Sequence, residues 1–235
     1  MRKILASDYD HTFYVNDEDI ELNKKAVKRF RDAGNLFIIA TGRSYMDLQK
    51  KVNAYNLVYD YAIIDHGAGI IDNEGNGIDS IFIENTIIPS IKKDLRLEDS
   101  ISNFCCSMFE SRVDFEHKNL TKIDVKYKTK EEAWQVNEII NKKYGDYVIS
   151  YFLTSNAIEI ISNKTNKSHA IEVLAELLEI DKRNIYTIGD GYSDMEMIRD
   201  FNGYRMENSV EGLKKMTDKS VKNVAELVEI IQKNH

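Results

Sequence analysis

The sequence has little cysteine and little proline, and each scarcity excludes a class of protein. The two cysteines among 235 residues, Cys105 and Cys106, are adjacent. They therefore form neither a disulfide framework nor a spaced set of metal ligands, and they fit a reducing cytosol. One proline and 11 glycines leave little room for a flexible linker or a low-complexity tract.

Long apolar runs and basic blocks are missing as well. No stretch approaches the ~18 consecutive apolar residues that a transmembrane helix needs. The first ten residues, MRKILASDYD, contain only the apolar run ILA before charge returns, so we expect no signal peptide. The net charge is −7 and no basic block stands out, which argues against a nucleic-acid partner. We therefore expect a cytoplasmic protein with neither a membrane nor a nucleic-acid partner.

The composition is that of an ordinary globular protein. Hydrophobic residues make up 43% of the chain and charged residues 30%. A chain of 235 residues can bury a sizeable core without disulfide or metal support. The length predicts one large domain or two modest ones.

Both ends of the chain alternate between strand and helix patterns. Short apolar runs predict strands over 3–7, 36–40 and 61–64, and helical spacing predicts helices over 20–33 and 44–52. The alternation returns later with predicted helices over 168–178, 194–200, 210–216 and 224–232 and strands over 184–188 and 204–206. Strands that alternate with helices indicate a parallel sheet covered by helices.

The middle of the chain has a different pattern. The Gly- and Asn-rich segment 67–84 predicts one hairpin or two. Beyond it we predict helices over 90–98 and 131–144 and strands over 104–110, 122–128, 147–153 and 157–162, an αββαββ order. The predicted fold is α/β: a doubly wound parallel sheet from residues 1–84 and 163–235, interrupted by an α+β domain over 85–162.

Polar side chains follow the predicted parallel strands where each strand ends. Asp8 and Asp10 follow the first strand, Thr41 follows the second, and Asp190 and Asp194 follow the strand at 184–188. Ligands of open α/β sheets bind at this edge. Residues i and i+2 of an extended chain point the same way, so Asp8 and Asp10 would face one site. Clustered carboxylates need a cation, and oxygen ligands favour Mg²⁺.

Positive charge is expected across from these carboxylates. Arg43 and one lysine near the loop 162–168 could provide it. Acidic metal ligands that face cationic groups indicate a phosphate ester as substrate.

Four segments carry a resemblance to a known family. SDYDHTF, IIATGRS, NKTNKSHAI and IGDGYSDMEM resemble, in this order, the four motifs of the haloacid dehalogenase superfamily, and most closely its Cof-like sugar-phosphatase branch. The insertion between the second and third motifs matches the place where that branch carries a cap domain. The resemblance implies a catalytic core over 1–84 and 163–235 and a cap over 85–162.

The resemblance also implies roles for the acidic residues. Asp8 would be the nucleophile that forms an aspartyl-phosphate. Asp10 would be the general acid for the leaving oxygen and then the base for water. The backbone carbonyl of Asp10 and the carboxylates of Asp8 and Asp190 would bind Mg²⁺, and Asp194 would complete or support the metal shell.

The implied phosphate-binding groups come from the second and third motifs. Thr41 would donate its hydroxyl to the transferring phosphoryl group, with help from the Gly42 amide. Lys167 would neutralise that group and hold the nucleophile, and it counts with Thr41 among the implied catalytic residues. Lys164 is a weaker candidate for the same lysine.

Two further residues could contact the substrate, and three depart from the family pattern. Arg43 is either a substrate contact or a structural ion-pair partner, and His11 either contacts substrate or only shapes the site. Ser193 stands at a usual Asn, His66 at another, and Glu207 at a usual Gly. These departures affect peripheral geometry rather than the implied chemistry.

The predicted function is that of an enzyme, a Mg²⁺-dependent phosphoric monoester hydrolase. It would hydrolyse a small phosphorylated metabolite, with a sugar phosphate as the first candidate, through an aspartyl-phosphate. One alternative is a phosphotransferase or mutase of the phosphomannomutase type. Another is a catalytically weak metabolite-binding protein. A response-regulator-like signalling module is shorter, has no cap and lacks the second acid. No sequence pattern indicates an oligomeric state.

Overall fold

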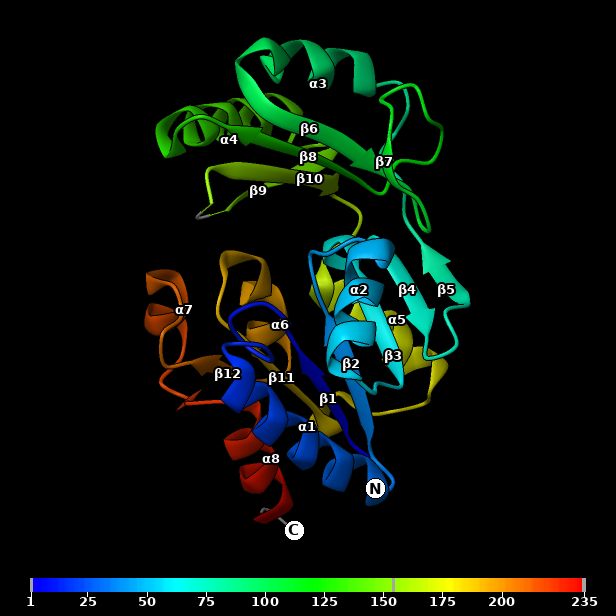
Figure 1. Cartoon of the computed structure of the whole chain (residues 1–235), viewed down its shortest axis with the longest axis vertical. Coiled ribbons are helices and arrows are strands. Elements are labelled where there is room, and N and C mark those ends of the chain that lie inside the picture. The colour runs from blue at the N-terminus through cyan, green and yellow to red at the C-terminus, as the bar shows by residue number, and fades with distance from the viewer. Residues whose placement is uncertain (1, 154, 234–235) are drawn as a thin grey trace.

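The computed structural model describes residues 2–153 and 155–233 and contains two β-sheets, one above the other (Figure 1). The larger sheet has eight strands and the smaller has five. Both ends of the chain contribute to the larger sheet, and the middle of the chain forms the smaller one. The predicted α/β fold with an inserted α+β unit is confirmed.

The eight-stranded sheet is parallel except at one edge. Its order is β13-β12-β11-β1-β2-β3-β4-β5, and the pairs from β13 to β3 are parallel. The last two pairs, β3 with β4 and β4 with β5, are antiparallel. The strands are β1 (Ile4–Ser7), β2 (Leu36–Ala40), β3 (Tyr61–Ile64), β4 (Gly69–Asp72), β5 (Gly77–Ser80), β11 (Ile185–Gly189), β12 (Asn202–Met206) and β13 (Ser220–Val221).

Helices cover both faces of this sheet, which makes it doubly wound. On one face α1 (Asp17–Asp32), α2 (Tyr45–Tyr55) and α8 (Val224–Lys233) pack against a buried apolar cluster. On the other face lie α5 (Lys167–Leu177), α6 (Met195–Asp200) and α7 (Glu211–Met216). None of the helices within 2–153 and 155–233 is long and apolar enough to cross a membrane.

The start of α1 shows how local sequence sets an element boundary. The side chain of Asn16 accepts hydrogen bonds from the backbone N–H groups of Glu18 and Asp19, which caps the helix. The helix therefore begins at Asp17, three residues before the predicted start, because the apolar spacing reveals only the buried stripe from Ile20 onward.

The five-stranded sheet is antiparallel, and within residues 2–153 and 155–233 its helices lie on one face only. Its order is β7-β6-β8-β10-β9. Its elements are α3 (Ile88–Asp94), β6 (Ser100–Cys106), β7 (Ser111–Val113), β8 (Lys122–Tyr127), α4 (Lys130–Tyr144), β9 (Val148–Leu153) and β10 (Ala157–Ser162). Figure 1 shows α3 and α4 on the side away from the larger sheet, so the other face of the five-stranded sheet is turned towards it.

Short elements differ from the prediction. The structure adds β7 and β13, and the helix predicted over 90–98 ends at Asp94 and is followed by a 3-10 turn (Leu97–Asp99). Further 3-10 turns are Asp65–Gly67, Lys182–Asn184 and Tyr192–Asp194. Strands of two or three residues carry no readable alternation, and tertiary pairing alone defines them. We propose that residues 85–162 form a domain of their own, because every strand of the smaller sheet lies within them.

Candidate active site

Three neighbouring strands of the larger sheet end at one rim. The order β11-β1-β2 places the ends of these strands side by side, with Asp190, Asp8 and Thr41 just beyond them. The backbone N–H of Asp8 donates a 2.9 Å hydrogen bond to the carbonyl of Ile188, which fixes the first residue after β1 against β11. The rim predicted from the strand ends therefore exists.

Three carboxylates converge at this rim. Asp8, Asp190 and Asp194 each place one oxygen within 4.8 Å of the others. Asp8 is 7% exposed and Asp194 1% exposed. Burial raises the pKa of Asp8 well above its ordinary value, although Lys167 opposes the shift, and Asp194 and Asp190 raise it further. Burial and Asp194 likewise raise the pKa of Asp190. The structure thus gathers negative charge where water is largely excluded.

A buried lysine balances part of this charge. Lys167 is 1% exposed, and its Nζ lies 2.6 Å from Asp8 Oδ1 and 2.7 Å from Asp194 Oδ1. Burial opposes the charge on Lys167, but Asp194 and Asp8 raise its pKa above the ordinary value, so the lysine is a cation. The alternative, Lys164, lies outside this group and pairs with Glu84 at 2.8 Å.

Asp194 holds the loop after β11. One of its oxygens accepts from Lys167, and the other accepts from the backbone N–H groups of Asp190 at 3.0 Å and Gly191 at 2.9 Å. A side chain at Gly189 would place its Cβ 2.4 Å from Asp194 Cγ, so this approach requires glycine. Asp194 is therefore fully hydrogen-bonded and fixes the position of Asp190.

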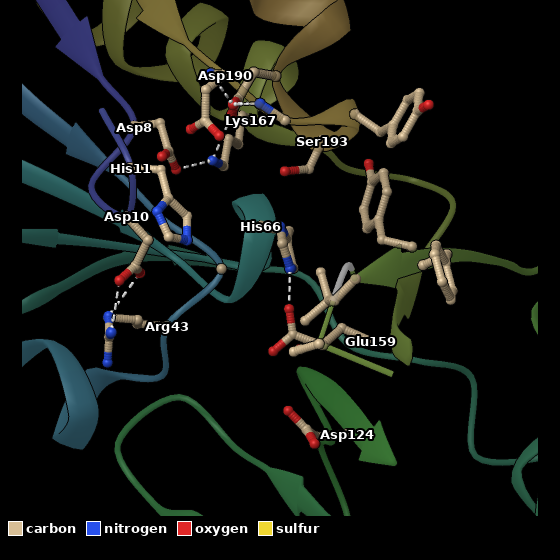
Figure 2. Close-up of a pocket in the computed structure, with 18 of the residues that line it drawn as sticks. Asp8, Asp10, His11, Arg43, His66, Asp124, Glu159, Lys167, Asp190 and Ser193 are labelled. Carbon is tan, nitrogen blue, oxygen red and sulfur yellow. Dashed lines mark hydrogen bonds and ion pairs between the residues drawn. The ribbon is translucent and has the colours of Figure 1, made fainter. Parts of the chain in front are cut away.

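Asp10 points away from the three carboxylates. Both of its oxygens accept hydrogen bonds from Arg43, at 2.7 Å from Nε and 2.6 Å from Nη2. The chain turns sharply here, with His11 at φ 62. Figure 2 shows the His11 side chain between Asp8 and Asp10 on the same side of the cleft. The structure thus brings Asp10, His11 and Arg43 to the site but pairs the acid with the arginine.

Thr41 and Gly42 follow β2. Thr41 is 1% exposed, and its hydroxyl oxygen accepts a 3.1 Å hydrogen bond from the backbone N–H of Arg43. Gly42 lines the cleft, whereas Thr41 lies behind it. A Cβ at Gly42 would lie 2.3 Å from the imidazole of His66, so glycine here leaves the space that His66 fills.

The rim forms one wall of a cleft of about 430 Å³ between the two sheets. Figure 2 shows Asp8 and Lys167 on one side and Glu159 and Asp124 on the other. The five-stranded sheet contributes Phe104, Lys122, Asp124, Tyr151, Phe152 and Glu159 to the lining. A cleft of this volume suits a small metabolite.

Four charged or titratable residues join the two sheets, and we call them the interdomain charge cluster: Asp65, His66, Lys122 and Glu159. Lys122 donates to the Gly42 carbonyl at 2.5 Å and to Glu159 at 2.7 Å, and it lies 3.5 Å from Asp65. His66 bonds the second oxygen of Glu159.

Buried charges set the protonation of this cluster. Burial would raise the pKa of Glu159, but Lys122 and His66 hold it well below its ordinary value. Burial lowers the pKa of His66 despite the attraction of Glu159. Burial raises the pKa of Asp65 to about 6. Glu159 is therefore an anion that a buried lysine stabilises.

The sequence prediction missed Lys122, Asp124 and Glu159. One signal was available, because Glu159 is an acid within the apolar run AIEIIS, and every residue of this strand is buried, Glu159 included. Of the family departures, His66 and Ser193 line the cleft, and Glu207 does not.

A model of the haloacid dehalogenase-like hydrolase family matches residues 5–113 and 106–228 of the chain. The chain belongs to this family. A Buchnera aphidicola (subsp. Baizongia pistaciae) protein named "Putative phosphatase" is 29% identical over 92% of the chain and 90% of its own length. The HMP-PP phosphatase of Yersinia pestis (strain Pestoides F) is 24% identical over 91% of the chain and 87% of its own length.

Structural comparison gives the same family fold. A haloacid dehalogenase-like hydrolase from Bacteroides thetaiotaomicron superposes with a TM-score of 0.79 at 18% identity, covering 98% of this chain and all of that one. In the present chain, the three converging carboxylates of Asp8, Asp190 and Asp194 offer a divalent metal ion a set of oxygen ligands. Such an ion would offset both burial and the repulsion among the carboxylates, which together raise the pKa of Asp8 and Asp190.

Proposed function

We propose that this hydrolase is a Mg²⁺-dependent phosphatase that acts on a small phosphorylated metabolite, with a sugar phosphate as the first candidate. The observation that carries the proposal is the Asp8 carboxylate, which faces the cleft, is held at 2.6 Å by a buried lysine and lies beside Asp190. The phosphatase names of its relatives support the same reaction class. We further propose a cytoplasmic enzyme without nucleic-acid or membrane partners.

Asp8 is the nucleophile in this proposal. One of its oxygens attacks phosphorus, the bond from phosphorus to the leaving oxygen breaks, and Asp10 gives a proton to that oxygen. Water then attacks phosphorus and loses a proton to Asp10, which releases phosphate and restores Asp8. Two easier steps replace one difficult displacement.

The proton transfer requires the pair of Asp10 and Arg43 to separate and Asp10 to take up a proton from water, since both oxygens of Asp10 accept from the guanidinium and the paired carboxylate has no proton to give. A phosphate group can bind a guanidinium in the same bidentate way. Arrival of the substrate phosphate would therefore draw Arg43 from Asp10 and place the arginine on the substrate. His11 would shape the space between the two acids.

The transferring phosphoryl group would be bound from three directions. Lys167 faces it beside Asp8, and the Gly42 N–H can donate to it from the cleft lining. The Thr41 hydroxyl, buried just behind the lining, would donate its hydrogen to the phosphoryl group while still accepting from the Arg43 N–H. Preorganised donors of this kind stabilise the charge that develops in the transition state.

The proposed metal ligands are the carboxylates of Asp8 and Asp190 and the backbone carbonyl of Asp10. Asp194 supports them, because its own oxygens bond Lys167 and the loop N–H groups. Mg²⁺ would neutralise phosphate charge and orient the phosphoryl group.

The test is phosphate release from para-nitrophenyl phosphate with and without Mg²⁺. The wild type should turn over only with the metal, and Asp8→Asn should abolish turnover. Asp32→Asn, an exposed acid outside the cleft, is the matched control and should behave as wild type. Activity that survives in Asp8→Asn would refute the nucleophile. With sugar phosphates, a second phosphorylated product would indicate the phosphotransferase alternative, and binding without turnover would indicate the metabolite-binding protein.

A further inference from the structure

The wall of the cleft opposite Asp8 carries polar groups that the proposed chemistry does not use. It consists of the uncovered face of the five-stranded sheet, and the leaving group of a substrate bound at Asp8 would lie against it (Figure 2). The polar groups that have no hydrogen-bond partner in the protein determine which functional groups the leaving group needs for binding here.

Two of them are already saturated. Lys122 donates to Gly42 and Glu159, and Glu159 accepts from Lys122 and His66 with both of its oxygens. The hydrogen bonds of these residues are made to each other, to Gly42 and to His66, so they join the two sheets.

Asp124 is different. It lines the cleft from β8 and is only partly buried. Among the described residues, the hydrogen-bonding partner that acts on its carboxyl is another acid, Glu159, rather than a donor group. Apart from this contact with Glu159, no described residue is hydrogen-bonded to the Asp124 carboxyl, so it can accept a hydrogen bond from a ligand in the cleft.

The position of Asp124 in the sheet lowers the stability of the folded protein. Asp124 on β8 and Glu159 on β10 are direct cross-strand partners. Like charges directly opposite each other destabilise a sheet. Burial and Glu159 raise the pKa of Asp124 to about 7. A neutral residue at this position would make the folded protein more stable. The acid is therefore better explained by an interaction with a ligand in the cleft.

A second, independent group points to the same ligand. Tyr151, on β9, is 8% exposed and lines the cleft, and its hydroxyl has no hydrogen-bond partner among the described residues. Buried tyrosine hydroxyls are normally hydrogen-bonded. Phe104 on β6 is the direct cross-strand partner of Asp124 and adds apolar surface to the cleft lining, and Glu159 lies between Asp124 and Tyr151 in the same row of partners.

We infer that Asp124 and Tyr151 form a subsite for a hydroxylated leaving group, in which a substrate hydroxyl donates to the Asp124 carboxylate and a substrate oxygen accepts from the Tyr151 hydroxyl. This inference rests on the proposed phosphatase function and names its specificity residues. Phe104 would pack against the C–H face of the ring. A polyol or sugar monophosphate has this combination of hydroxyls and apolar face, and a plain aryl phosphate lacks the hydroxyls.

The test compares kcat/KM for glucose, mannose and fructose monophosphates with kcat/KM for para-nitrophenyl phosphate. In Asp124→Ala the ratio of sugar to aryl activity should fall about 10- to 100-fold, as expected for a lost hydrogen bond to a charged group. In Tyr151→Phe, which removes only the oxygen, the ratio should fall about 3- to 10-fold. Lys126→Ala on the same strand and Tyr147→Phe beside β9, both outside the cleft lining, should leave the ratio unchanged.

An unchanged ratio in both subsite variants, or a wild type that hydrolyses the aryl phosphate and none of the sugars, overturns the subsite. A wild type that hydrolyses neither substrate refutes the proposed function instead. In that case calorimetric binding of the same sugar phosphates decides the subsite: weaker binding in Asp124→Ala supports it, and equal or absent binding overturns it.

Discussion

Replacing Lys122 by methionine should destabilise the folded protein strongly, because this lysine is the cation of the interdomain charge cluster. Its side chain is 4% exposed and reaches the Gly42 carbonyl, Glu159 and Asp65. Methionine keeps most of the volume and removes the charge. Glu159 would then keep only His66 as a partner.

The magnitude follows from the burial of both partners. Breaking a buried ion pair by removing one partner costs about 3–5 kcal/mol, because the remaining charge is left uncompensated. For a chain of this size that corresponds to a melting temperature lower by roughly 6–20 °C. The loss should be larger at pH 8 than at pH 5. Without Lys122, burial would raise the pKa of Glu159 from below its unfolded value to above it and would raise that of Asp65 further, so the folded variant takes up protons and regains stability as the pH falls.

The assay is urea denaturation followed by circular dichroism at pH 5 and pH 8. Lys126→Met, an exposed lysine on the same strand, is the matched control and should change stability by less than about 0.5 kcal/mol. The double variant Lys122→Met/Glu159→Gln removes both charges and should recover at least half of the loss. A cost below about 1 kcal/mol for Lys122→Met at pH 8 would refute the cluster as a stabilising link between the sheets.

Two further predictions concern residues that contact the interdomain charge cluster, Gly42 and Asp124. Gly42→Ala puts a Cβ 2.3 Å from the His66 imidazole, so we expect phosphate release to fall at least tenfold and His66→Ala in the same chain to restore much of it; no loss would contradict the close packing. Asp124→Asn should stabilise the protein at pH 8 by about 0.2–1 kcal/mol, because it removes the repulsion with Glu159. Urea denaturation should show this gain shrinking towards pH 5, since the wild-type carboxyl, with its pKa raised to about 7, is then protonated in the folded state. A gain that grows as the pH falls would contradict this assignment.

Much of the rim could be predicted from the sequence, because it depends on local rules. Buried strands end where polar residues begin, and parallel strands bring those ends to one edge. The predicted strand Leu36–Ala40 matches β2 and the predicted strand Tyr61–Ile64 matches β3. The convergence of Asp8 and Asp190 follows from this arrangement, although their catalytic and metal-binding roles remain proposals.

The opposite wall could not be predicted in the same way. Lys122 and Glu159 are 37 residues apart in the sequence, and their contact depends on the register of β8 against β10. The alternation of Ile123 and Val125 with polar residues predicts that one face of the strand is exposed to solvent. It does not reveal that this face is turned towards the rim that carries Asp8. The pairing of Asp10 with Arg43 likewise depends on a turn and a loop that approach each other only in the folded chain.

The most direct test of the account is to find the phosphoryl group on the enzyme. Enzyme mixed with Mg²⁺ and para-nitrophenyl phosphate would be quenched within one turnover, reduced with borohydride to convert an acyl phosphate into an alcohol, digested and examined by mass spectrometry. We expect Asp8 to be converted to homoserine in the presence of substrate and metal and to stay unchanged when either is omitted. Rapid phosphate release with no modification at Asp8, or with modification at another acid, would contradict the account.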